Sequence, residues 1–139
     1  MVNKSKKDLI VFCGIPASGK TTLSKQIAKE HNAIRYSFDK MRCLQHKELI
    51  PYIKQSLKDG NNTVVDSTYT LKRARTDLLD AIKDIDCKRT LIFMNTPLDE
   101  CIHRNTQRKH PVPQHLVEVI SSSMQPPSID EGWDEILYF

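Results

Sequence analysis

The sequence predicts an α/β fold with a five-stranded parallel sheet flanked by helices. Short apolar or β-branched runs alternate along the chain with amphipathic helical stretches, as crossover connections between parallel strands require. The first apolar run, residues 9–13, leads directly into a glycine-framed string and then into a helical stretch. A chain of 139 residues can bury one core, so we expect a single domain over 1–139 with room for one reaction.

The string from Gly14 to Thr21 has the spacing G-x-x-x-x-G-K-T and predicts a phosphate-binding P-loop. Gly14 and Gly19 let the backbone approach an anion, which the loop amides and the positive end of the next helix then face. Lys20 is expected to reach the β and γ phosphates, and the Thr21 hydroxyl to ligate Mg²⁺. The strand before and the apolar spacing after argue against a chance match in a Gly-containing turn. The residues expected to bind ATP here are Gly14, Ala17, Ser18, Gly19, Lys20, Thr21 and Thr22.

A short second strand is predicted over 33–37, and a core helix follows it. Pro51 is compatible only with a first turn of that helix, and Gly60 is a stop signal. The apolar face of the helix has helical spacing: Leu49, Ile53 and Leu57.

The β-branched run 63–66 predicts a third strand that ends in Asp66, at the edge where open α/β sheets build their sites. Thr70 is expected to be the N-cap of the next helix. In that helix Ala74, Leu78 and Ile82 should face inward, and Lys72, Arg73 and Arg75 outward.

Residues 90–94 predict a fourth strand. Thr96 and Pro97 then indicate a helix start, as an N-cap and a first-position proline, and the helix is expected to carry Arg104 and Arg108. The break at 111–113 opens another helix, which 126–127 ends and whose apolar face holds Leu116, Ile120 and Met124. Residues 135–139 should add the last strand, and the absence of repeats and linkers suggests a complete chain.

Composition excludes several classes of protein. The formal charge of +4 and pI near 8.9 permit a polyanionic substrate, although a solvated lysine-rich surface and tail explain them equally well. The cysteines are scattered without a C-x-x-C pair, so we expect reduced core residues rather than zinc or disulfides: Cys13, Cys43, Cys87 and Cys101. No apolar run approaches the roughly 20 residues of a membrane span, and no signal peptide is evident, which favours a cytoplasmic location.

Other motifs narrow the P-loop chemistry. No N-K-x-D string is present, which disfavours guanine recognition. Asp66 is followed by Ser67 rather than by a glutamate that would polarise water, and Asp99-Glu100 lies in a helix start. Transfer to a bound acceptor is therefore favoured over hydrolysis.

Three further motifs complete a recognisable set: Asp39 and Arg42 as D-x-x-R, Asp66-Ser67-Thr68 after the third strand, and Arg104 to Arg108 before Val112-Pro113. Together with the P-loop, they resemble the kinase domain of the polynucleotide 5′-hydroxyl kinases, the phage and bacterial end-healing enzymes within the small P-loop kinases. The resemblance covers nearly the whole chain. It implies a P-loop kinase fold with a helical lid at about 104–113, ATP and Mg²⁺ as cofactors, and a nucleic acid 5′-hydroxyl end as substrate. Separate phosphatase and ligase proteins would perform any other end-processing steps.

The resemblance also implies residue roles. Asp39 would be the general base, Arg42 would hold the acceptor phosphate, and Asp66 would support that arginine. Arg108 on the lid would stabilise charge on the moving phosphoryl group, and Arg104 would form a wall of the adenine site. Thr68 is also expected among the substrate-binding residues. The string after Asp66 is Ser67-Thr68-Tyr69, whereas the family often has Asp-Thr-Asn with the Asp one position later.

Each role has a structural alternative. Asp39 would serve equally as a helix N-cap, Arg42 and Asp66 as a structural ion pair, and Arg104 and Arg108 as an i, i+4 pair on a solvated helix face. Trp133 is expected to pack beneath the last strand rather than to stack on a base. The histidines share no metal-ligand spacing and are expected at the surface: His31, His46, His103, His110 and His115.

Three functions follow as hypotheses. The first is an ATP-dependent kinase of the 5′-hydroxyl end of RNA or DNA. The second is a kinase of a small acceptor such as a nucleoside, sugar or antibiotic, because the same fold serves all of these. The third is a non-catalytic interaction module in which ATP only sets the conformation.

Overall fold

The computed structural model describes residues 6–39, 41 and 45–139. Five strands form one sheet in the order β2-β3-β1-β4-β5, and every neighbouring pair is parallel. The strands are β1 (Lys7–Cys13), β2 (Ile34–Ser37), β3 (Thr63–Asp66), β4 (Cys87–Phe93) and β5 (Glu135–Tyr138). The α-helices are α1 (Lys20–Glu30), α2 (Ile50–Lys58), α3 (Lys72–Ala81), α4 (Leu98–Thr106) and α5 (Gln114–Ser122), with 3₁₀ turns η1 (His46–Leu49) and η2 (Ile129–Glu131).

The predicted five-stranded parallel sheet is confirmed, including the terminal strand. The main difference is β4, which begins at Cys87 rather than at residue 90 because all seven residues of β1 pair with it. Its first residues include Lys88 and Arg89, which lack an apolar pattern. Backbone hydrogen bonding to β1 therefore extends β4 over residues whose side chains gave no sequence signal for a strand.

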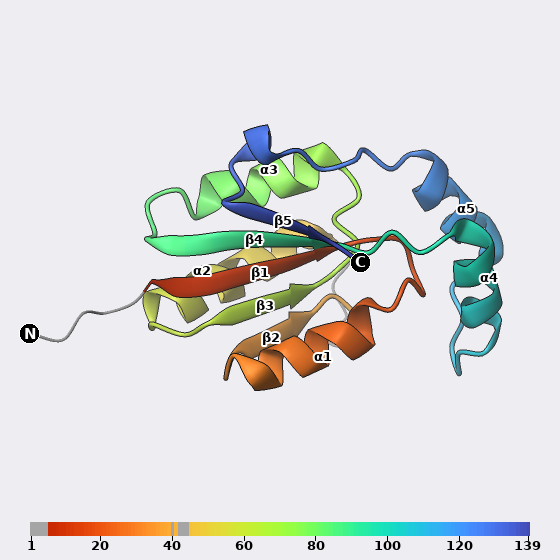
Figure 1. Ribbon diagram of the computed structural model, residues 1–139, viewed down its shortest axis with the longest axis horizontal. Helices are drawn as coiled ribbons and strands as arrows, with labels where there is room; N and C mark the ends of the chain where they lie inside the picture. The colour runs from red at the N-terminus through yellow and green to blue at the C-terminus, as the bar shows by residue number, and fades with distance from the viewer. Residues whose placement is uncertain (1–5, 40, 42–44) are drawn as a thin grey trace, which may run out of the picture.

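Helices cover both faces of the sheet, which explains the continuous apolar run of β1 (Figure 1). Leu9 and Val11 pack with α2 and α3 on one face, whereas Ile10 and Phe12 pack with α1 on the other. Helices α4 and α5 stand beyond the carboxyl ends of the strands (Figure 1). They form an arm of the molecule beside the P-loop, and Val117 of α5 packs there with Ile15 of the loop.

Two predicted hydroxyl caps are wrong. Helix α3 begins at Lys72 after the extended Leu71 and has no side-chain cap at that position, so Thr70 lies one residue too early. The Lys72 N–H is satisfied by the side-chain carbonyl of Gln125 at 2.8 Å. Pro97, not Thr96, holds the N-cap position of α4. At α3, a partner distant in sequence thus replaces the local cap that the sequence suggested.

The C-terminal helices also differ in detail from the prediction. Helix α4 ends at Thr106, so Arg108 lies in the connection that follows it. In α5 the fully buried residue is Val117, whereas the predicted inward residue Leu116 is 43% exposed. The other two predicted residues, Ile120 and Met124, are partly buried and pack against Val117 and Cys101, so the predicted face is correct apart from Leu116.

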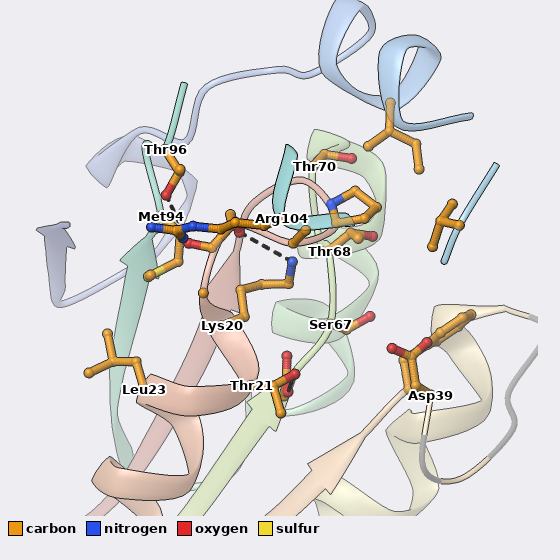
Figure 2. Close-up of a pocket in the computed structure, with 18 of the residues that line it drawn as sticks. Lys20, Thr21, Leu23, Asp39, Ser67, Thr68, Thr70, Met94, Thr96 and Arg104 are labelled. Atoms are coloured by element: carbon orange, nitrogen blue, oxygen red, sulfur yellow. Dashed lines mark hydrogen bonds between the residues drawn. The ribbon is translucent and has the colours of Figure 1, made fainter. Parts of the chain in front are cut away.

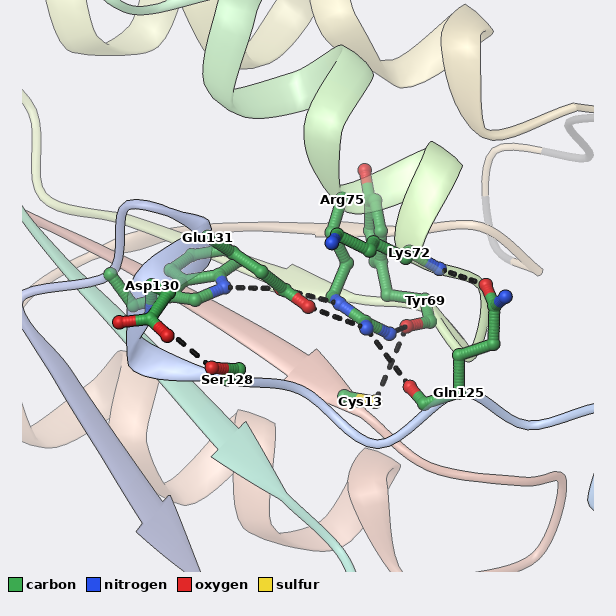
Figure 3. A network of polar contacts seen from close by, with 9 residues as sticks. Cys13, Tyr69, Lys72, Arg75, Gln125, Ser128, Asp130 and Glu131 are labelled. Carbon is green, nitrogen blue, oxygen red and sulfur yellow. Dashed lines mark hydrogen bonds and ion pairs between the residues drawn. The ribbon is translucent and has the colours of Figure 1, made fainter.

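Arg75 was predicted to face solvent and is fully buried instead. Its guanidinium donates to both carboxylate oxygens of Glu131, at 2.8 and 2.9 Å (Figure 3). It also donates to the backbone carbonyls of Tyr69 and Gln125. Trp133, buried as predicted, donates its indole N–H to Glu131 at 3.0 Å. This network joins α3 to the chain between α5 and β5.

The cysteines that the structure describes are core residues, as predicted: Cys13, Cys87 and Cys101 are buried and free. The prediction for Cys43 lies outside the described residues. Among the described helices, none has the length and apolar character needed to cross a bilayer.

The Arg75–Glu131 pair predicts a large stability effect. Replacing Glu131→Gln leaves a buried guanidinium without a counter-charge, which should lower the free energy of unfolding by about 3 kcal/mol or more. Burial by itself raises the pKa of Glu131, but hydrogen bonds from Arg75 and Trp133 and the arginine charge outweigh it, so the pKa lies below its usual 4.5. The pair therefore contributes fully above about pH 4.5, and its contribution falls as the pH drops further.

Denaturant unfolding of both proteins between pH 3 and 7 measures this effect. The difference between wild type and variant should shrink below about pH 4.5. The control is Asp86→Asn, which removes an exposed partner of Lys6 and should barely change stability. Equal stability of Glu131→Gln and Asp86→Asn would contradict the prediction.

Candidate active site

A cleft of about 1030 Å³ lies at the carboxyl ends of the strands, between the P-loop and the α4–α5 arm (Figure 2). It gathers nearly all of the sequence-predicted site residues. Those that line it are Ala17, Ser18, Gly19, Lys20, Thr21, Thr22, Asp39, Asp66, Thr68, Arg104 and Arg108. Gly14 lies in the loop with its carbonyl bonded to Lys20, and Arg42 lies outside the described residues.

The P-loop is tightly built around its glycines. A Cβ at Gly14 would lie 2.8 Å from the Ser18 hydroxyl and 3.0 Å from the Met94 Cβ, so no side chain fits there. Gly19 has φ of 102° and Ala17 has φ of 65°, both in the left-handed region. Such left-handed positions turn neighbouring amides toward one side of a loop and make a concave anion site.

Lys20 is the buried cation of the loop. Its Nζ donates to the carbonyls of Gly14 and Ile15 at 2.9 and 2.7 Å. Burial lowers the pKa of Lys20 to about 8, and the negative charge of Asp66 opposes this shift only in part. The Lys20 ammonium is desolvated and bonded mainly to neutral carbonyls. A nearby anion would therefore stabilise its charge strongly.

Asp66 is bound by an arginine that the sequence analysis did not single out. Its Oδ2 accepts from Arg35 Nη2 at 2.5 Å and from the hydroxyls of Thr21 and Ser24, both at 3.2 Å. Arg35 Nε also donates to Ser24 at 2.8 Å. The expected partner, Arg42, lies outside the described residues, so Arg35 is the arginine on this carboxylate in the described part of the chain. The sequence signal for it was a charged residue within the short strand β2.

The residues beside the loop fit a magnesium ion. The Thr21 hydroxyl and the Asp66 carboxylate are hard oxygen donors, already 3.2 Å apart. In P-loop proteins the cation is held by a loop Ser or Thr and a strand-end Asp, and its remaining ligands are phosphate oxygens and water. Thr21 and Asp66 could therefore hold a cation that arrives with a nucleotide.

Two arginines line the cleft from the arm. Arg104 extends over the P-loop, because a Cβ at Gly19 would lie 3.5 Å from its Nη1. It also pairs with Glu100 at 2.6 Å, where both side chains are about half exposed. Arg108 follows the end of α4 and lines the same cleft. Arg104 and Arg108 were alternatively expected to share a solvated helix face, but only Arg104 lies in α4, and its i, i+4 partner is Glu100.

Asp39 is exposed and lies two residues after the end of β2, on the part of the cleft away from Arg104 (Figure 2). The backbone N–H of Phe38 donates to the Asp66 carbonyl at 3.1 Å, which ties this segment to the end of β3. The helix that Asp39 was alternatively expected to cap falls on residues that are in part outside the described ranges.

His46 is a site residue that sequence reasoning missed. Its Nδ1 lies 2.9 Å from the Ser67 hydroxyl and its Nε2 lies 3.3 Å from the Thr68 hydroxyl. It lines the cleft and is partly buried, so the surface prediction is wrong for it, while His31, His103, His110 and His115 are exposed as predicted. The contacts span about twenty residues of sequence, and no local pattern indicated them.

Solved structures with the same arrangement identify the class of fold. A fungal RNA kinase superposes with a TM-score of 0.77 at 16% identity, over 96% of this chain and 38% of that one. A gluconokinase from Sinorhizobium meliloti 1021 superposes with a TM-score of 0.67 at 16% identity, over 94% of this chain and 81% of that one. The chain therefore has the P-loop kinase fold, with a parallel sheet and a P-loop after the central strand β1.

The family is shown by sequence. The family described as "AAA domain" matches residues 9–127, and the chain belongs to it. An L-seryl-tRNA(Sec) kinase from Methanococcus maripaludis is 26% identical over 143 aligned positions, covering 91% of this chain and 56% of the relative. The chain therefore spans about half the length of that curated relative.

The pKa of Lys20 predicts proton uptake on ATP binding. In the free protein a pKa of about 8 leaves the amine largely neutral at about pH 9, whereas bound phosphates favour the ammonium. ATP affinity should therefore fall as the pH rises above about 8. Calorimetry in buffers of different ionisation enthalpy should detect uptake of up to one proton at about pH 9 and less at about pH 7. Lys20→Arg, which stays charged, should show no such difference.

The position of Asp66 predicts a metal-specific defect. Asp66→Asn should reduce the gain in ATP affinity that Mg²⁺ provides by roughly 10–100-fold, while affinity for metal-free ATP changes little. Calorimetric titration with and without Mg²⁺ measures both quantities. Asp84→Asn, at an exposed position on the loop before β4, is the control. An unchanged Mg²⁺ dependence in Asp66→Asn would remove Asp66 from the cation site.

Proposed function

We propose that the protein is an ATP-dependent kinase that transfers the γ-phosphoryl group to the 5′-hydroxyl end of RNA or DNA. The observation that carries the proposal is the shared cleft, in which an exposed carboxylate, Asp39, faces the same space as the buried cation Lys20. An anion cradle and a free base around one cleft are the minimum for phosphoryl transfer to an alcohol.

The nucleotide occupies the P-loop half of the cleft. Lys20 exchanges its bonds to the loop carbonyls for bonds to the β and γ phosphates, and Arg104 lies against the adenosine side. Thr21 and Asp66 would hold Mg²⁺, which would supply positive charge to neutralise the phosphate oxygens. ATP is the expected nucleotide because the chain has no guanine-reading N-K-x-D string.

The acceptor enters on the Asp39 side. Asp39 accepts the proton of the attacking hydroxyl as its oxygen forms a bond to the γ-phosphorus. The bond from that phosphorus to the β-γ bridging oxygen breaks, and ADP leaves with the electron pair. Arg108, on the arm, stabilises the charge on the transferring group. Arg42 holds the phosphate next to the acceptor hydroxyl, as the resemblance implies.

Two lines of support favour a nucleic acid acceptor over a small one. The D-x-x-R pair Asp39 and Arg42 matches the end-healing kinases. The names of one curated relative and one structural neighbour, L-seryl-tRNA(Sec) kinase and fungal RNA kinase, both refer to RNA. The name of the sequence relative also suggests another acceptor, the hydroxyl of a serine attached to tRNA.

A small acceptor is the second candidate function. The gluconokinase neighbour supports it. This chain covers 81% of the gluconokinase but only 38% of the fungal RNA kinase, so it is nearer in size to the gluconokinase. An ordered panel separates the candidates: a 5′-hydroxyl RNA oligonucleotide, its DNA counterpart, seryl-tRNA and gluconate, each incubated with γ-labelled ATP and Mg²⁺.

We expect label transfer to an oligonucleotide and loss of that transfer in Asp39→Asn. The rate should fall by about 10²–10⁴-fold, because only the general base is removed. ATP affinity, measured by calorimetry, should stay unchanged, and Asp84→Asn should retain wild-type activity. Transfer to gluconate alone would replace the first candidate with the second, and full activity of Asp39→Asn would end its assignment as the base.

A further inference from the structure

A polar cluster on the acceptor side of the cleft has no part in the proposed transfer step. It consists of His46, Ser67 and Thr68, and all three line the cleft. Each ring nitrogen of His46 meets one hydroxyl, Ser67 at 2.9 Å and Thr68 at 3.3 Å. Within the described residues, neither hydroxyl has another side-chain partner. Both are therefore free to make one further hydrogen bond with a ligand.

The imidazole gives the two hydroxyls opposite polarity. Burial lowers the pKa of His46 below its usual 6.5, so the ring is neutral near pH 7. A neutral imidazole has one N–H and one lone pair. One hydroxyl must accept from the ring and keeps its O–H to donate, while the other donates to the ring and keeps its lone pairs to accept.

Aromatic contacts hold the ring in this position. The centroid of His46 lies 5.1 Å from that of Phe38 and 4.7 Å from that of Tyr69. Phe38 directly precedes Asp39, and Tyr69 directly follows Thr68. The imidazole thus connects the segment that carries the base to the segment that carries both hydroxyls, and neither can shift without moving the ring.

A donor and an acceptor side by side match a ligand alcohol, which both accepts and donates. We propose that His46 is a positioning residue which, through Ser67 and Thr68, makes the site select an acceptor with a second free hydroxyl on the sugar that reacts. The inference rests on the proposed function: at the 5′ end of RNA this group is the 2′-hydroxyl, which DNA lacks. A free sugar offers the same chemistry.

The test compares oligonucleotides that differ only in the 5′-terminal sugar, ribose against 2′-deoxyribose. Fluorescence anisotropy without ATP measures binding, and labelled ATP then measures KM and kcat. Wild type should prefer the ribose end by roughly tenfold in Kd and KM, with similar kcat, because the deoxy ligand leaves the two hydroxyls unpaired. Gluconate and a deoxy analogue form a parallel arm.

Four single variants and one double variant locate the effect. His46→Phe keeps the ring between Phe38 and Tyr69 but removes both polar contacts, so the preference for ribose should disappear through KM alone. His46→Asn can retain the contact with Ser67 and His46→Gln that with Thr68, so each should restore part of the preference. Ser67→Ala leaves the contact of His46 with Thr68, so it should lose only part of the preference, and adding it to His46→Phe should cause no further loss. Thermal unfolding identifies any variant that fails to fold. If His46→Phe does not fold, the comparison of His46→Asn and His46→Gln with wild type tests the inference.

The outcomes separate the two proposals. Preferential binding of the ribose end without label transfer rejects the nucleic acid kinase and keeps the role of His46. Selection only in the sugar arm assigns the cluster to a small acceptor and rejects the nucleic acid end. Equal affinity for hydroxyl and deoxy ligands in both arms, or a preference that His46→Phe leaves intact, overturns the inference.

Discussion

The site depends on the close packing of Gly14 against its neighbours. Its N–H donates to the Thr68 carbonyl at 2.9 Å, and the space where a Cβ would stand is filled by Ser18 and Met94. The first residue of the phosphate cradle is therefore fixed to the chain that leaves β3. That same chain carries Asp66, which contacts Thr21 of α1, and Ser67 and Thr68, which contact His46. One segment, 66–69, sets the geometry of both halves of the cleft.

A buried charge network holds this segment from behind. Tyr69 has φ of 42°, an unfavourable left-handed conformation for a bulky residue. Its carbonyl accepts from Arg75 at 2.8 Å and from the Cys13 thiol at 3.2 Å, and its side chain is fully buried. Arg75 in turn is neutralised by Glu131. The guanidinium thus stabilises the strained backbone of Tyr69 at the site. The buried ion pair therefore has a structural role in holding this backbone, in addition to its own contribution to stability.

The sequence predicted what local patterns encode. The strand before Gly14, the β-branched run 63–66 and the strand-end Asp66 each carry their signal within a few residues, and all lie where expected. The errors at Arg75 and His46 and the omission of Arg35 share another cause. Each has a partner distant in sequence: Glu131, Ser67 and Asp66. A charged or polar side chain is predicted to face solvent unless its partner is known, and only the fold supplies the partner.

The arm over the cleft is a built structure rather than a loose loop. The side chain of Asn105 is buried and clamps the connection between α4 and α5, donating to the Val112 carbonyl at 2.6 Å and accepting from the Val112 N–H at 3.0 Å. Cys101 and Val117 pack the two helices together beside Ile15 of the P-loop. Asn105 directly follows Arg104, and Arg108 lies in the connection that Asn105 clamps, so the clamp fixes the segment from which both arginines line the cleft. Catalytic charge works best on a preorganised support, because no energy is then spent on ordering it during the reaction. The arm therefore holds Arg104 and Arg108 at the cleft on a fixed support, opposite the P-loop.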